Sequence, residues 1–170
     1  MRLGLLGVVL TAPVGSSPGG TSAAQEPCPS TPGQRALDLV NEERRLLALP
    51  VLEADTLLVM ASRLQAEDMA AHGVVSHQGS DGSDPSQRVT AVGYSWIWVG
   101  ENIAGGQSVP DEVVAGWMRS EAHRANILSP DFTSAGVARA ESSVGELGTY
   151  WVMVYAAADP PSAAVVPCHP

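Results

Sequence analysis

One stretch of the sequence, residues 94–104, constrains the fold more than any other. It begins with the most aromatic run of the chain, Tyr94-Ser95-Trp96-Ile97-Trp98, and ends in Gly100-Glu101-Asn102-Ile103-Ala104. A run this apolar predicts a strand that is buried on both faces. This strand carries a carboxylate, Glu101, at its far end. Burying a carboxylate without a partner costs on the order of several kcal/mol or forces its protonation. The partner of Glu101 is therefore the main question that the sequence poses.

Composition narrows the classes of protein to which the chain can belong. Its 170 residues suffice for one domain with a substantial core, and a hydrophobic content of 45% indicates a globular protein rather than a disordered one. The formal net charge is −9, from 18 acidic against 9 basic residues. An acidic chain without a basic cluster argues against binding to nucleic acid or to an anionic membrane surface.

The first residues predict export from the cell. Arg2 is the only charge before Glu26, residues 3–9 form a short apolar run, and Ser22-Ala23-Ala24 offers small residues for cleavage. The apolar run is too short to cross a bilayer. We therefore expect residues 1–24 to be a signal peptide and the mature protein to be secreted, with no membrane span. The alternative is an untethered apolar N-terminus.

Two cysteines stand near the opposite ends of the expected mature chain. Cys28 lies in an N-terminal tail, residues 25–33, and Cys168 in a C-terminal tail, residues 159–170. In an oxidising compartment a disulfide between them would close nearly the whole chain into one loop, worth about 5 kcal/mol in the chain-entropy account. The alternative is two free thiols.

Caps and apolar periodicity predict the order of the elements. Helices begin at caps such as Thr31, Asp55 and Asp84, and the charged insert at residues 41–45 is expected to be solvated. Strand 149–157 is apolar on both faces, so the sheet should be covered on both sides. Its hairpin link to the preceding strand predicts a mostly antiparallel sheet. The expected fold is an α/β three-layer α-β-α sandwich. Expected helices cover residues 31–47, 55–73, 84–92, 108–119 and 120–128, and expected strands 94–104, 132–140 and 149–157.

The chain lacks the common catalytic motifs. Beyond the expected signal peptide it contains no Gly-x-Ser-x-Gly, no His-Glu-x-x-His, no Cys-x-x-Cys and no glycine-rich phosphate loop. His77, Glu101 and His123 remain as dispersed polar candidates, with Ser120 and Glu121 beside the last. Two imidazoles and a carboxylate could hold Zn²⁺ with one position open for water, or act as acid and base, with Glu101 the candidate catalytic residue. The residues alone favour a plainer interpretation, a hydrogen-bonded cluster that stabilises loops.

A set of ordered motifs changes this balance. Gly100-Glu101-Asn102-Ile103-Ala104 is followed by Trp117-Met118-Arg119-Ser120-Glu121-Ala122-His123-Arg124-Ala125-Asn126-Ile127-Leu128. With Asn41-Glu42-Glu43-Arg44, Ser76-His77 and Tyr150-Trp151-Val152, they resemble the CAP superfamily, the SCP-like extracellular domain of cysteine-rich secretory and pathogenesis-related proteins, in its short bacterial form. The resemblance places an SCP-like domain at residues 34–158 and implies an α–β–α sandwich.

The resemblance also implies a site. Animal and plant members carry a cleft of two histidines and two glutamates that can bind a divalent metal. His77, Glu101 and His123 match three of these positions, whereas Ser120 stands where the second glutamate belongs and Glu121 lies one residue away. This departure predicts only weak Zn²⁺ binding. Some members also bind sterols or lipids, and the family has no settled reaction, so the resemblance does not make the chain an enzyme.

The expected function is accordingly a secreted SCP-like domain whose His/Glu cleft binds a divalent metal or a small envelope or lipid ligand. One alternative is a metal-assisted hydrolase of peptide or cell-wall bonds, with Glu101 as general base. The other is a structural polar cluster that binds no ligand.

Overall fold

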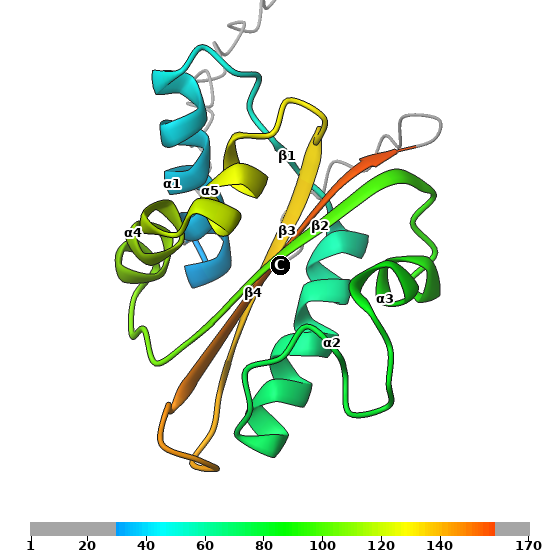
Figure 1. Cartoon of the computed structure of the whole chain (residues 1–170), viewed down its shortest axis with the longest axis vertical. Coiled ribbons are helices and arrows are strands. Elements are labelled where there is room, and N and C mark those ends of the chain that lie inside the picture. Colours follow the sequence, from blue (N-terminus) through cyan, green and yellow to red (C-terminus); the bar gives the residue numbers. More distant parts are fainter. Residues whose placement is uncertain (1–29, 159–170) are drawn as a thin grey trace, which may run out of the picture.

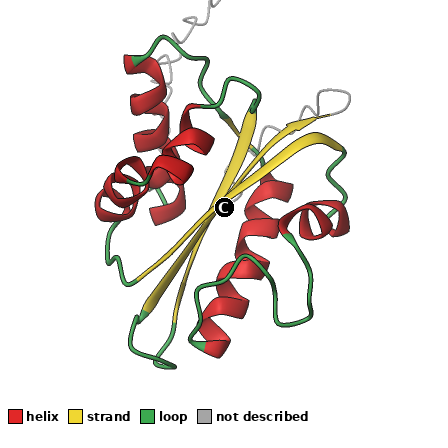
Figure 2. Ribbon diagram, viewed as in Figure 1, coloured by secondary structure: helices red, strands yellow, loops and turns green. Residues whose placement is uncertain are grey.

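The computed structural model describes residues 30–158, which form a sheet between two layers of helices (Figure 1; Figure 2). Helices α1, α4 and α5 cover one face of the sheet, and α2 and α3 cover the other. The expected α/β three-layer sandwich is therefore confirmed. The elements are α1 (Pro32–Leu46), β1 (Glu53–Ala54), α2 (Thr56–His72), α3 (Pro85–Ala91), β2 (Trp96–Gly105), α4 (Pro110–Arg119), α5 (Glu121–Leu128), β3 (Ser134–Glu141) and β4 (Thr149–Ala158).

The sheet is mixed, whereas the sequence predicts a mostly antiparallel one. Its strand order is β1-β3-β4-β2, with β4 antiparallel to both of its neighbours. The short strand β1, which the sequence did not predict, pairs with β3 in parallel. This order leaves β2, the strand that carries Glu101, at an edge of the sheet.

Strand β4 is the centre of the core. All of its residues from Tyr150 to Ala157 are buried, which confirms that the sheet is covered on both sides. Alternate side chains enter two separate apolar clusters because successive residues of a strand point to opposite faces. Trp151, Met153 and Tyr155 pack in the cluster with α1, α4 and α5. Tyr150, Val152 and Val154 pack in the cluster with α2 and α3.

The predicted starts of α1 and α2 are confirmed. Each start depends on a side chain that caps the helix within two or three residues. Thr31 accepts a hydrogen bond from the Gln34 backbone N–H, and Asp55 caps α2 in the same way. At the end of α2, Gly73 adopts a left-handed φ of 69°, which a glycine does without a Cβ clash. The chain then leaves α2 for the loop that carries His77.

The expectation that the aromatic strand is buried on both faces is wrong for its first half. Trp96, Ile97 and Trp98 are 36%, 52% and 57% exposed. The reason is topological. Strand β2 pairs on one side only, and α4 and α5 contact its second half, where Trp117 Nε1 donates to the Ile103 carbonyl. These two helices therefore leave the first half of β2 partly open to solvent.

The expectation that residues 41–45 are solvated is wrong for two of them. Asn41 and Arg44 are buried. Asn41 makes a two-way hydrogen bond with the Leu52 backbone. Arg44 donates to three carbonyls within 2.8 Å, at Pro50, Ile127 and Ser129, and desolvation by burial lowers its pKa. Buried charge is tolerated here because carbonyl oxygens surround it.

The predictions for the two ends of the chain lie outside the described residues. These are the signal peptide at residues 1–24, the N-terminal tail up to residue 29, the C-terminal tail at residues 159–170, and the disulfide between Cys28 and Cys168. Residues 32 and 33, expected in the N-terminal tail, begin α1. Within residues 30–158, none of the helices combines the length and the apolar character that crossing a bilayer requires.

Candidate functional site

Glu101 lies at the centre of the site, and both of its carboxylate oxygens are occupied. Its side chain is 1% exposed. Oε1 accepts a hydrogen bond from His77 Nδ1 at 2.8 Å, and Oε2 accepts one from Arg88 Nη2 at 2.8 Å. Paired in this way, a buried carboxylate keeps its charge without the full cost of desolvation. One predicted histidine and one arginine that was not predicted are therefore its partners.

Arg88 holds three segments of the chain together. Its helix, α3, begins at a capping box in which Asp84 and Gln87 exchange hydrogen bonds with each other's backbone. Besides Glu101, the guanidinium donates to the His77 carbonyl at 3.0 Å and to the Ser83 carbonyl at 2.9 Å. The sequence contains one indication that a cation pairs with Glu101, because a buried carboxylate requires a cationic partner. The sequence analysis gives that role to the histidines, and the structure adds Arg88 to them.

The Glu101 contact determines how His77 faces solvent. Because a carboxylate only accepts hydrogen bonds, the neutral imidazole must carry its proton on Nδ1. Its Nε2 then presents a lone pair away from Glu101. The His77 side chain is 54% exposed. The buried ion pair thus fixes the tautomer and orientation of a half-exposed imidazole.

His123 lies close to this cluster but does not bond to Glu101. Its backbone carbonyl accepts from Asn102 Nδ2 at 3.0 Å, which holds the start of α5 against β2. Desolvation by partial burial lowers the pKa of His123, and its electrostatic interaction with His77 lowers it further. The structure therefore brings His77 and Glu101 into contact and places His123 within electrostatic reach of His77.

A second polar network, which the sequence analysis missed, anchors α5 to the strand. Asn126 Nδ2 donates to the Glu101 carbonyl at 3.2 Å and to Asn102 Oδ1 at 2.9 Å. Asn102 in turn donates to the Tyr155 hydroxyl at 3.0 Å. Complete burial raises the pKa of Tyr155 well above its ordinary value, so this hydroxyl stays neutral and structural. The network fixes the backbone on either side of Glu101.

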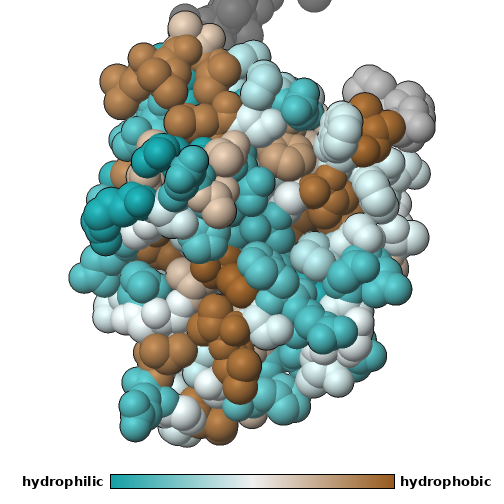
Figure 3. Space-filling view, in the orientation of Figure 1, coloured by the Kyte–Doolittle hydropathy of each residue, from teal (hydrophilic) through white to brown (hydrophobic). Residues whose placement is uncertain are grey.

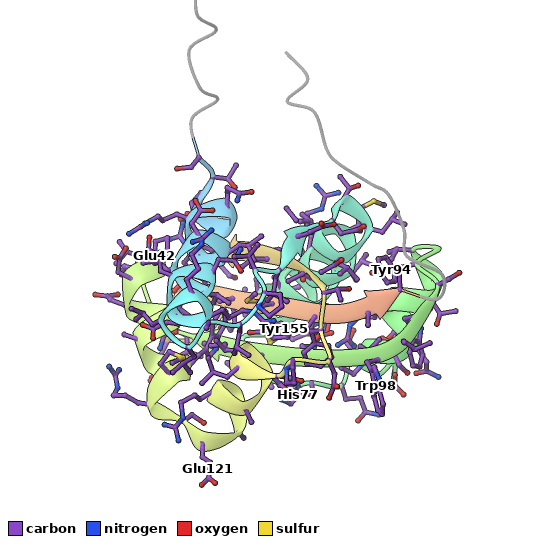
Figure 4. The ribbon with its side chains drawn as sticks, turned by 90° about the horizontal axis from the view of Figure 1, so that it is seen from above. Glu42, His77, Tyr94, Trp98, Glu121 and Tyr155 are labelled. Atoms are coloured by element: carbon purple, nitrogen blue, oxygen red, sulfur yellow. The ribbon has the colours of Figure 1, made fainter. Side chains whose placement is uncertain are left out.

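The structure does not bring Glu121 to the cluster. Glu121 is exposed, and Figure 4 shows its side chain pointing into solvent, away from His77. Ser120 precedes α5 as its N-cap residue but makes no side-chain capping bond.

A solvent-open pocket of about 500 Å³ lies beside His77, between the start of α3 and the first half of β2. Figure 4 shows His77, on the loop after α2, and Trp98, on β2, lying on the same side of the sheet. We call this hollow the β2 pocket. Its lining includes His77, Glu101, Asp84, Ser86, Trp96 and Trp98.

The arrangement does not fit Zn²⁺ held by His77, Glu101 and His123 together. Both oxygens of Glu101 are engaged, and the Arg88 guanidinium, 2.8 Å away, repels a cation that approaches this carboxylate. Within residues 30–158, no three side chains of His, Cys, Asp or Glu lie close enough together to hold a metal. Glu101 is instead placed to orient His77 through its Nδ1 proton.

Comparison with known proteins agrees with this architecture. Residues 37–155 match the family described as "CAP: Cysteine-rich secretory protein family". Uncharacterized protein YkwD of Bacillus subtilis is 37% identical over 122 residues, which cover 72% of this chain and 46% of the relative. Uncharacterized membrane protein YlbC of the same species is 31% identical over 64% of this chain and 31% of its own length. The chain thus spans less than half the length of these relatives.

Solved structures share the fold. An outer surface protein from Borrelia burgdorferi superposes with a TM-score of 0.68 at 21% identity, over 74% of this chain and 92% of its own. An extracellular protein containing an SCP domain from Bacillus anthracis superposes with a TM-score of 0.66 at 26% identity, over 74% of this chain and 40% of its own. Fold, motif order and family match lead to one conclusion: the chain belongs to the CAP family of cysteine-rich secretory proteins.

Proposed function

We propose that this chain is an extracellular binding module whose β2 pocket takes a small ligand of the cell envelope. The observation that carries the proposal is the half-exposed His77 imidazole, which the buried Glu101–Arg88 pair holds in one tautomer at the edge of an open pocket. A fixed lone pair on Nε2 is a ready acceptor for a ligand hydroxyl or amide.

Energetic reasoning favours binding over a purely structural cluster. A buried ion pair stabilises a fold poorly, because desolvating the two charges offsets most of their attraction. Apolar residues of similar size would fill the same space at less cost. In this chain the pair also orients a group that faces solvent, and preorganised polar groups of this kind raise affinity by reducing the ordering that binding requires.

The matched structures support an envelope ligand. Two of them come from proteins described as an outer surface protein and as an extracellular protein. The predicted signal peptide agrees with secretion of this chain, and its net charge of −9 disfavours nucleic acid as a partner.

Zn²⁺ binding through His77 Nε2 and His123 is a second candidate. Its support is the electrostatic interaction between the two imidazoles, which is the smaller of the two causes, after burial, that lower the pKa of His123. Glu101 would then orient His77 without touching the metal, as carboxylates beside metal-bound histidines commonly do. With only two protein ligands, we expect this binding to be weak.

The test uses the ring nitrogens of His77 as reporters. Nitrogen NMR of the labelled protein is recorded with cellotetraose, tetraalanine, palmitate, glycerol phosphate and Zn²⁺, each added alone. We expect at least one organic probe to shift the His77 Nε2 signal saturably and, in calorimetric titrations, to bind at least about tenfold more weakly to His77→Ala.

His72→Ala is the matched control. The His72 side chain is 55% exposed, close to the value for His77, and it lies outside the β2 pocket. Its loss should leave binding unchanged. If none of the probes moves the His77 signal, the proposed binding function is wrong. If Zn²⁺ alone moves it, the second candidate replaces the first. Cleavage of tetraalanine or cellotetraose that disappears in Glu101→Gln would instead establish the hydrolase alternative.

A further inference from the structure

We propose that Trp96 and Trp98 form a platform in the β2 pocket for an uncharged saccharide, with one sugar ring stacked on the Trp98 indole and its hydroxyls donating to His77 and Asp84. This inference rests on the proposed binding function and names the ligand class. It concerns residues to which the sequence analysis gave only a core role.

The exposure of these two rings is the first observation. The chain has four tryptophans. Trp117 and Trp151 are 1% and 0% exposed, whereas Trp96 and Trp98 are 36% and 57% exposed. A cluster of large, exposed apolar side chains beside a pocket is typical of a ligand-binding surface. Trp96, Ile97 and Trp98 are consecutive and all line the same hollow.

The Trp96 ring is fixed in place before any ligand arrives. Its Nε1 donates to Thr90 Oγ1 at 3.0 Å, and the Thr90 hydroxyl donates to the Ser86 carbonyl at 2.9 Å. The indole N–H is therefore used inside the protein, and the ring contributes its apolar surface to the pocket. A rigid aromatic surface costs little side-chain entropy on binding.

The polar groups of the pocket select a ligand that donates hydrogen bonds. His77 Nε2 presents a lone pair. Asp84 Oδ1 accepts from Ser86 Oγ and the Gln87 backbone, and a carboxylate has a second oxygen to offer. Sugar rings combine hydroxyl donors on their rim with a face of C–H groups that packs on an indole. The pocket offers a counterpart to both features.

Charge and shape disfavour the other ligand classes. Asp84 and the net charge of −9 repel a phosphate or carboxylate ligand. An acyl chain needs an enclosed apolar tunnel, whereas this pocket is open and carries Asp84, Ser86 and His77 on its walls. The surface over α3 is predominantly hydrophilic (Figure 3). A peptide laid against the open edge of β2 is the remaining competitor, and the experiment includes it.

The experiment titrates the full mature chain with cellotetraose and with the β-1,4-linked tetramer of N-acetylglucosamine, by calorimetry and tryptophan fluorescence. Because Trp117 and Trp151 are buried, a fluorescence change reports on Trp96 and Trp98. We expect saturable binding of at least one glycan. Trp98→Ala should weaken it by about tenfold or more, and Trp98→Phe, which keeps an aromatic face, by about threefold or less.

Leu46→Ala is the control for loss of an exposed apolar side chain. Leu46 is 78% exposed at the end of α1, and α1 and α3 lie on opposite faces of the sheet (Figure 1), so glycan affinity should not change. A melting curve confirms that each variant is folded. If Trp98→Ala binds the glycan as tightly as the unchanged protein does, the proposed platform is wrong.

The saccharide inference and the proposed function fail in different ways. If neither glycan binds but tetraalanine or palmitate shifts the His77 signal, the ligand class is wrong and the binding module stands. If tetraalanine binds and depends on Trp98, the platform serves a peptide. If none of these probes reaches His77, both proposals fail together.

Discussion

His72 and His77 are equally exposed, yet their surroundings differ. The two side chains are 55% and 54% exposed, and each has an acidic residue beside its Nδ1. His72 ends α2, and its Nδ1 lies 2.9 Å from the Asp68 carbonyl and 3.4 Å from an Asp68 carboxylate that is 26% exposed. His77 stands on a loop and donates at 2.8 Å to a carboxylate that is 1% exposed.

The two histidines differ in how firmly the acidic partner of each imidazole is held. Water competes for every partner of His72, so its orientation is weakly held. Behind His77, Glu101 is itself fixed by Arg88, whose side chain is 5% exposed. Exposure makes an imidazole available to a ligand, and a buried partner gives it one tautomer and one direction. Of these two histidines, only His77 is both exposed and paired with a buried carboxylate.

The largest effect should come from removing the buried cation. Arg88→Met leaves the Glu101 carboxylate buried and unpaired on one side, and we expect the free energy of unfolding to fall by about 3 kcal/mol. Urea unfolding measures it. Arg63→Met is the control on the His72 side, because the Arg63–Glu67 pair is 64% exposed on both partners and should contribute about 0–1 kcal/mol.

A double-mutant cycle sharpens this result. Glu101→Gln and Arg88→Met should each destabilise the protein, whereas the double variant should lose less than the sum, with a coupling of about 2 kcal/mol. Additive losses would mean that the two side chains do not act as a pair in solution.

The histidines themselves should differ by less. His77→Ala takes a donor from buried Glu101 Oε1, so we expect a loss of about 1 kcal/mol in the free energy of unfolding. His72→Ala should change it by less than about 0.5 kcal/mol. Equal losses in the two variants would remove the distinction on which the site depends.

The smallest effect concerns pH. Burial, and to a lesser degree the electrostatic interaction with His77, lower the pKa of His123 below 6.5 in the folded protein. The unfolded chain therefore binds the proton more readily, and the stability that neutral His123 provides is lost as pH falls below about 6.5, until the folded-state pKa is passed. Melting temperatures between pH 7.5 and 5 should fall less in His123→Gln. An unchanged pH dependence would show that His123 is not shielded from water.

Features that depend on residues close together in the sequence could be predicted, whereas features that depend on contacts between distant segments could not. Thr31, Asp55 and Asp84 cap helices through residues two or three positions away, so the helix starts could be predicted. The alternating apolar residues of β4 predicted a sheet covered on both faces. The exposure of Trp96 to Trp98 could not be predicted in the same way, because the pattern of a strand does not state whether it will lie at the centre or the edge of a sheet.

The same distinction between local signals and distant contacts applies to the residues of the site. His77 and Glu101 were identified as members of one cluster, and the structure joins them. Arg88 was missed because its pairing with Glu101 depends on how α3 lies against β2. Arg44 was misjudged for a similar reason. In the sequence it stands among charged neighbours, and its carbonyl partners at Ile127 and Ser129 come from a distant part of the chain.

The tautomer of His77 tests the central claim most directly. Nitrogen NMR of the ligand-free protein near neutral pH distinguishes a protonated Nδ1 from a protonated Nε2. The account predicts that His77 carries its proton on Nδ1, hydrogen-bonded to Glu101, while His72 shows the averaged signals of a freely exchanging ring. A His77 ring that is protonated on Nε2, or that averages as His72 does, would contradict it.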